Sequence, residues 1–277
     1  TPAPLNRPRQ VVDTGGVTAL HTTIDRSLAG VCQTTGRFKQ SLRDAKAAFV
    51  RALTPVADGI DFLARGTYHV WRNRAYLTFI KLGNIALVNL EFALKRERVV
   101  GRPYSVKIES TNICNTKCQL CPTGIGLQGR PKGKMTFEQY PSLVDGMAWH
   151  VRDLDLSMWG DPLIVPDIYR MIRYAHDKGV WTYISSNLPA FKIEIPKALR
   201  DKGETKDQAT HLVESGLDLM TCSLHGATQE TYAIYQPGKK LDESLAKIRH
   251  ILATRDRLGS ATPQVQLNFV VTRYNEH

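Results

Sequence analysis

Three cysteines lie close together at Cys114, Cys118 and Cys121, with the spacing C-x3-C-x2-C. Thiolates at this spacing can bind three irons of a four-iron cluster, whereas ordinary electron-transfer clusters use four protein thiolates. A structural zinc site would also need a fourth ligand, and no second Cys or His pair follows. The motif therefore predicts a [4Fe-4S] cluster with one iron open to a substrate or cofactor. A non-catalytic iron-sulfur or zinc binding module is the alternative, because short cysteine motifs recur by accident.

The sequence from residue 104 onwards alternates between strand-like and helix-like segments. Strands are expected at 104–110, 154–159, 180–185, 217–224 and 264–271, and helices at 136–149, 167–178, 206–215 and 241–258. This alternation predicts right-handed βαβ units in a parallel sheet or barrel. Function in such folds gathers at the carboxyl ends of the strands, and the three cysteines directly follow the first strand.

The cysteine motif, preceded by the strand-like segment YSVKIES, resembles the radical S-adenosylmethionine (radical SAM) superfamily. The resemblance implies that Cys114, Cys118 and Cys121 bind a [4Fe-4S] cluster whose open iron chelates the amino and carboxylate groups of SAM. It implies that one electron, from a reducing partner such as flavodoxin or ferredoxin, cleaves SAM to methionine and a 5′-deoxyadenosyl radical. That radical takes a hydrogen atom from the substrate.

Polar residues at the ends of the later strands support the resemblance. Gly160-Asp161-Pro162 resembles the Gly-Glu-Pro motif of the family, which contacts the SAM amino group, although these residues are also common in plain turns. Serine and asparagine after the third strand suit the ribose hydroxyls of SAM, or alternatively cap the following turn. The residues expected to bind SAM are Gly160, Asp161, Pro162, Ser185, Ser186, Asn187, Ser223 and Val270.

The end of the fourth strand, SLHGATQETYAIYQPG, resembles a segment of radical SAM proteins that carry a SPASM or twitch extension. The family usually has Asp where this chain has His225, and Arg where it has Gln236. Because that Arg is expected near the SAM carboxylate, Lys239 or Lys240 is a candidate substitute. His225 is a candidate acid or base on the substrate side, with a packing or hydrogen-bonding role as the alternative.

The positive charge of the chain is concentrated before residue 104. Residues 1–103 hold 16 Lys and Arg against 7 Asp and Glu, which gives +9 of the total net charge of +11. Such a region suggests an anionic partner, such as a membrane surface, a nucleic acid or an acidic peptide, unless it is only a solvated helix surface. Nucleic-acid binding, the other alternative function, is disfavoured because the arginines are scattered and lack interleaved aromatic residues.

The strongest helix pattern in the basic region covers residues 68–98. Its apolar stripe is interrupted by Lys81, Asn84, Asn89 and Glu91, so it is not expected to span a membrane. Packing of the stripe on the catalytic domain is favoured over contact with an anionic membrane surface. Residues 38–64 are expected to be helical and residues 1–36 irregular.

Taken together, these patterns predict an α/β protein with two parts. Residues 1–103 are expected to form a basic, mainly helical extension. The resemblance implies that residues 104–277 form a partial (βα)6-type radical SAM barrel, whose sixth strand is either missing from this sequence or supplied by another segment. Five cysteines without a pairing pattern indicate a reducing compartment, and a cytoplasmic enzyme, in peripheral contact with a membrane if the extension binds one, is expected.

Overall fold

The computed structural model describes residues 74–276, which belong to a compact unit that begins at Val70. The segments expected before residue 74, and Cys32, lie outside the described residues. The division expected at residue 103 stays a prediction, although helix α3 (Phe79–Ala93) belongs to the same compact unit as the sheet.

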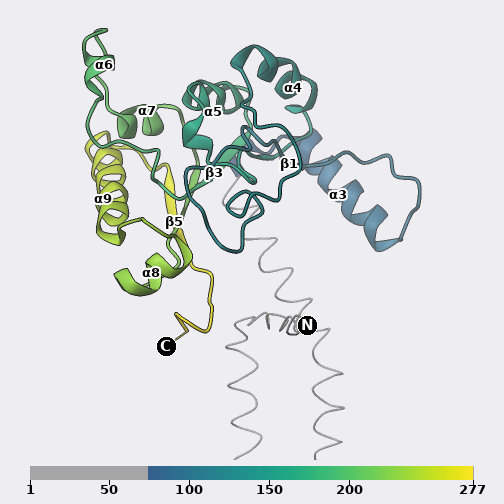
Figure 1. Cartoon of the computed structure of the whole chain (residues 1–277). Helices are drawn as coiled ribbons and strands as arrows, with labels where there is room; N and C mark the ends of the chain where they lie inside the picture. The colour runs from purple at the N-terminus through teal and green to yellow at the C-terminus, as the bar shows by residue number, and fades with distance from the viewer. Residues whose placement is uncertain (1–73, 277) are drawn as a thin grey trace, which may run out of the picture. The chain divides into compact units, whose positions relative to one another are not determined.

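A five-stranded parallel sheet forms the centre of this unit, with the strands in sequence order (Figure 1). Each strand pairs in parallel with the next, as the strand-helix alternation predicts. The fold is therefore α/β with five parallel strands, consistent with a partial barrel. The strands are β1 (Ser105–Lys107), β2 (Asp153–Asp155), β3 (Trp181–Ser186), β4 (Leu219–Ser223) and β5 (Gln264–Asn268).

Helices follow the strands in the predicted order. Two of them end at glycines with positive φ, Gly179 (+70°) and Gly216 (+76°), a conformation that favours glycine at a helix end. Short helices α6 and α8 were not predicted from the sequence. The helices that follow β1 are η2 (Phe137–Gln139), α4 (Tyr140–Met147), η3 (Pro162–Ile164), α5 (Ile168–Asp177), α6 (Lys197–Arg200), α7 (Gln208–Glu214), α8 (Gln229–Tyr235) and α9 (Leu241–Arg257).

The hydrophobic core lies between the sheet and helices α4, α5, α7 and α9. Leu154, Ile184 and Met220 supply it from successive strands, and each is almost fully buried. Ile172 of α5 and Ile251 of α9 are equally buried. The core fixes the strand order and so brings the strand ends, where the predicted site residues lie, to one edge.

Helix α3 contacts the rest of the unit through its polar side chains. Lys81 donates to the carbonyl of Gly179 (2.6 Å), and Glu91 accepts from the backbone amides of Val100 (2.8 Å) and Gly101 (3.0 Å). Asn84 exchanges hydrogen bonds with the backbone of Arg102. Buried polar groups need hydrogen-bond partners, and the partners of these side chains lie on the inward side of α3, the side that faces the rest of the unit.

The prediction that the apolar stripe of this helix packs on the catalytic domain is therefore wrong for the described residues. Ile80, Leu87, Leu90 and Leu94 are exposed, and no residue of α3 belongs to the described core. Three of the interrupting polar residues, Lys81, Asn84 and Glu91, hold the helix, whereas Asn89 is exposed and donates to the Ile85 carbonyl within it. Among the described helices, none has the length and apolarity to cross a bilayer.

Tyr76, in the short helix η1 (Arg74–Tyr76), ties the start of the described chain to the sheet. Its hydroxyl donates to Asp218 Oδ1 (2.6 Å) and lies 3.1 Å from His176 Nδ1, while Asp218 Oδ2 accepts from the Thr182 amide (2.8 Å). Burial raises the pKa of Asp218, so this carboxyl depends on its donors.

Tyr76→Phe should lower the free energy of unfolding by about 1.5–3 kcal/mol, because it removes a donor from a buried carboxyl and keeps the ring. Urea denaturation measures the loss. Tyr174→Phe is the matched control, since the Tyr174 hydroxyl donates to the exposed Asp145 and its removal should cost less. An equal or smaller loss for Tyr76→Phe would contradict this role.

Candidate active site

The three cysteines lie in the loop that directly follows β1. Cys118 is buried, and Cys114 and Cys121 are half-buried. The Cys121 amide donates to the Cys118 carbonyl (3.2 Å), and the chain folds back so tightly that a Cβ on Gly124 would lie 2.3 Å from that carbonyl oxygen. This close approach was not predictable from local sequence patterns.

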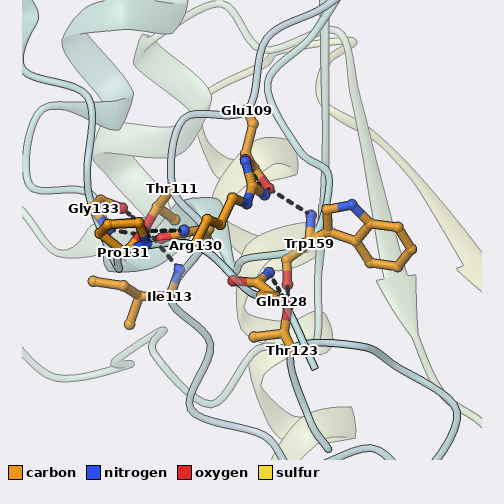
Figure 2. Close-up of polar contacts among 10 residues, drawn as sticks. Glu109, Thr111, Ile113, Thr123, Gln128, Arg130, Pro131, Gly133 and Trp159 are labelled. Carbon is orange, nitrogen blue, oxygen red and sulfur yellow. Dashed lines mark hydrogen bonds and ion pairs between the residues drawn. The ribbon is translucent and has the colours of Figure 1, made fainter. Parts of the chain in front are cut away.

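Hydrogen bonds on both flanks hold the cysteine loop, which spans residues 109–133 (Figure 2). Near its ends, the Thr111 hydroxyl donates to the Gly133 carbonyl (2.8 Å) and accepts from the Ile113 amide (3.1 Å). Arg130 pairs with Glu109 (2.5 Å), whose carboxylate also accepts from the Trp159 amide (3.3 Å). The loop after β1 is thereby tied to the chain that follows β2.

On the other side of the cysteines, Thr123 makes a second tie to the same chain. Its hydroxyl donates to the Trp159 carbonyl (2.8 Å), and Gln128 donates to that hydroxyl (Figure 2). Glu109, Thr123 and Trp159 were not predicted from the sequence, because their roles depend on contacts between distant segments.

Gly160 lies against the backbone that precedes Cys114. A Cβ at this position would fall 2.2 Å from the Thr111 carbonyl oxygen and 2.8 Å from that of Ile113. The next amide, of Asp161, donates to the Ile113 carbonyl (3.0 Å). Glycine is therefore required where the turn after β2 meets the cysteine loop.

Asp161 and Ser186 join the ends of β2 and β3. The Ser186 hydroxyl donates to both carboxylate oxygens of Asp161 (2.9 and 3.0 Å), and Asp161 also accepts from the Leu163 amide (3.1 Å) as the cap of η3. Burial raises the pKa of Asp161 to about 6, although these hydrogen bonds oppose the shift. The Asp161 carboxylate and the Ser186 hydroxyl therefore bond to each other, and this pair positions the ends of β2 and β3 relative to one another.

Asn187 lies nearest to the cysteines among the predicted residues of β3. Its amide nitrogen is 3.9 Å from Cys114 Sγ, and its Oδ1 accepts from Gln236 Nε2 (2.7 Å). Gln236 also reaches the Ser223 carbonyl at the end of β4 (3.4 Å) and is fully buried. Its Oε1 has no hydrogen-bond partner among the described residues, so a buried acceptor is left free on the side chain that bonds to Asn187.

Burial and the charges of neighbouring cysteines raise the pKa values of Cys114 and Cys118. Burial, together with the charges of Cys114 and Cys121, raises the pKa of Cys118 to about 12, and Lys239 opposes the shift. Burial also raises the pKa of Cys114. Three thiolates in such a place need a compensating positive centre, which a metal cluster supplies.

The arrangement fits a [4Fe-4S] cluster with an additional ligand. Three thiols from one loop form the donor set, and the Asn187 amide lies beside Cys114; Gln236, with its unpartnered oxygen, bonds to Asn187. No three Cys, His, Asp or Glu side chains of residues 74–276 converge on a point for a single metal ion. A cluster does not require such convergence, because each thiolate binds a different iron.

The remaining predicted residues lie at or near the carboxyl ends of the strands. Pro162 begins η3, and the Ser185 amide donates to the Ser157 hydroxyl (3.0 Å). The Val270 amide donates to His225 Nδ1 (3.1 Å), and the His225 ring packs edge-on against Tyr235 at 4.3 Å. These contacts match the packing and hydrogen-bonding alternative for His225.

The comparison with protein families now identifies the class. The model of the radical SAM superfamily matches residues 108–255, just over half of the chain. The chain belongs to this superfamily and is a radical SAM enzyme, whose family cofactors are a [4Fe-4S] cluster and SAM.

The curated relatives are distant. The chain is 25% identical over 175 residues to the AdoMet-dependent heme synthase of Methanosarcina barkeri, covering 62% of this chain and 44% of the relative. It is 25% identical over 171 residues to the enzyme of that name from Nitratidesulfovibrio vulgaris, covering 61% and 41%. The chain thus spans less than half the length of these relatives.

Among solved structures, the chain is similar to Streptococcus suis SuiB bound to S-adenosylmethionine. The TM-score is 0.49 at 16% identity, over 66% of this chain and 37% of that one.

Gly160→Ala should destabilise the protein by about 1–3 kcal/mol and lower its iron content after reconstitution, because the new methyl meets backbone that cannot move alone. Gly146→Ala in α4 is the control: nothing lies within 4 Å of its Cβ position, and alanine favours a helix. Thermal denaturation and iron analysis compare the two. Normal iron loading in Gly160→Ala would show that the close approach is not needed.

His225 should make stability depend on pH. Burial lowers its pKa from the ordinary 6.5 to about 4, so the neutral ring contributes stability that is present above pH 6.5 and lost as pH falls through 4. Allowing for partial screening, the loss is about 1–2 kcal/mol. Urea unfolding from pH 7 to pH 4 should therefore show a flatter profile for His225→Asn, which keeps an acceptor, than for the wild type. Parallel profiles would contradict this assignment.

Proposed function

We propose that the chain uses the edge formed by β1 to β4 to hold SAM on a cluster bound by Cys114, Cys118 and Cys121, and that it abstracts hydrogen from an unreactive carbon of its substrate. When bound, a reduced cluster with SAM on its open iron supplies a 5′-deoxyadenosyl radical. One observation carries the proposal: the turn at Gly160 and Asn187 at the end of β3 both meet the cysteine loop, and the buried Gln236 bonds to Asn187.

The residues of this edge have separate tasks in the proposal. The Gly160–Asp161 turn offers backbone groups to the SAM amino group, while the Asp161 carboxylate holds Ser186 and so fixes the end of β3. Asn187 lies between Cys114 and Gln236, where its amide can orient a ligand beside the cluster. The Asp161 side chain then acts mainly by holding the end of β3 in position.

Lys239 is the better substitute for the arginine that the family usually has at Gln236. It is half-buried, and its backbone amide donates to the Gln236 carbonyl (3.2 Å). Lys240 instead pairs with Glu243 (3.2 Å), and both side chains are exposed. We therefore assign contact with the SAM carboxylate to Lys239.

The finer classification rests on the segment from Ser223 to Gly238, which resembles SPASM or twitch proteins. Relatives of that kind act on peptides, lipids and other small molecules, and the curated relatives carry the name heme synthase. A reducing partner such as flavodoxin or ferredoxin would supply the electron. The substrate class stays open within this proposal.

The triple variant Cys114→Ala/Cys118→Ala/Cys121→Ala should lose the reconstituted iron and the formation of 5′-deoxyadenosine from SAM with dithionite under anaerobic conditions. Cys222→Ala is the control: that thiol is fully buried within strand β4, outside the cysteine loop, and should not bind iron. Iron content and chromatographic detection of 5′-deoxyadenosine measure both effects. Iron retained by the triple variant would overturn the ligand assignment.

A further inference from the structure

The outward side of α3 is an uncharged apolar surface. Its exposed residues recur at helical spacing, and five of them are more than half exposed: Phe79 (94%), Ile80 (61%), Leu90 (56%), Phe92 (84%) and Leu94 (62%). The charged residues within the helix, Lys81 and Glu91, are both buried on the inward side. In Figure 1 the helix projects beyond the β1 end of the sheet, so this surface is presented away from the core.

Cations gather where this helix ends. Lys95, Arg96, Arg98 and Arg102 are all exposed, with Glu97 as the acidic residue among them. The Glu91 carboxylate is already occupied by the Val100 and Gly101 amides. A groove of about 580 Å³ opens here, lined by Val88, Glu91, Phe92, Lys95, Arg96, Glu97, Val99, Gly101, Arg102 and Pro103.

We propose that α3 and residues 95–102 form a membrane-binding surface that lies on an anionic phospholipid bilayer. The apolar side of the helix enters the boundary between headgroups and acyl chains, and the four cations at its end meet lipid phosphates in and around the groove. Helices with one apolar side and flanking cations bind membrane interfaces in this way without crossing them. The buried Lys81 and Glu91 fix the helix to the protein, so that the apolar side is held outward.

The net charge of the possible partners favours a lipid bilayer over a protein segment on this surface. Residues 1–73 contain ten Lys and Arg against five Asp and Glu, so that segment of the same chain carries a net charge of +5. A second copy would bring an identical cationic rim to this surface. Residues 1–73 and a second copy would each bring positive charge to the cations at the helix end. An anionic bilayer instead offers an acyl layer for the apolar side of the helix and phosphates for the cations.

The proposal is tested by flotation of the full-length, reconstituted protein with phosphatidylcholine vesicles, with and without phosphatidylglycerol. We expect flotation only with phosphatidylglycerol and loss of it at high salt. Leu87→Glu/Leu90→Glu, and separately Lys95→Glu/Arg96→Glu/Arg98→Glu, should each weaken partitioning at least about tenfold.

Matched controls have comparable exposure elsewhere. Leu143→Glu/Leu258→Glu changes two leucines that are 44% and 39% exposed, and Lys197→Glu/Arg200→Glu/Lys202→Glu changes three exposed cations near α6. Both controls should float like the wild type. Circular dichroism and iron content verify that every variant is folded.

Amide hydrogen exchange of residues 79–94 distinguishes a bilayer from a second copy or another segment of the chain as the partner of this surface. Slowed exchange of this helix only when anionic vesicles are present supports the proposal. The proposal is overturned if the wild type does not float at low salt, if the α3 variants float normally, or if the helix is fully protected without vesicles. Protection that increases with protein concentration would indicate a second copy, and protection independent of concentration would indicate another segment of the chain.

Discussion

The close approach of the turn at Gly160 to the backbone before Cys114 is the contact on which the site depends. A Cβ at Gly160 would lie 2.2 Å from the Thr111 carbonyl oxygen, so the two segments touch backbone to backbone. The hydrogen bond from the Asp161 amide to the Ile113 carbonyl then fixes the carboxylate against Ser186. One contact thus sets the cysteine loop, the end of β2 and the end of β3 relative to one another.

A second constraint concerns where polar groups are buried. Asp161, Asp218, Lys81 and Gln236 are all removed from solvent, and each has a donor or acceptor from a distant segment. A buried polar group without a partner is costly, so these bonds specify one arrangement of the elements. The free Oε1 of Gln236 is an exception, and it belongs to the side chain that bonds to Asn187, the neighbour of Cys114.

Much of this was predictable because the fold follows local patterns. The strand-helix alternation predicted the five parallel strands, and glycines at 179 and 216 marked helix ends. The helix expected from residue 136 starts with η2, where the Gln139 side chain accepts from the Thr136 amide (3.2 Å). The roles of Gly124, Glu109 and Trp159 were not predictable, because they arise from contacts between segments.

The orientation of α3 shows the limit of periodicity as a guide. An apolar stripe normally faces a core, and the interruptions at Lys81, Asn84 and Glu91 argue only against a membrane span. In the structure these three residues define the inward side, since each finds backbone partners there. Periodicity locates a helix and its two sides, but the partners available to its polar residues decide which side faces the protein.

Electron paramagnetic resonance of the reduced, reconstituted wild-type protein tests the central claim most directly. The account predicts the signal of one [4Fe-4S] cluster, and a change in that signal when SAM is added, because SAM binds the iron that lacks a cysteine ligand. A signal that SAM leaves unchanged, or iron held without a four-iron cluster signal, would contradict the account of this site.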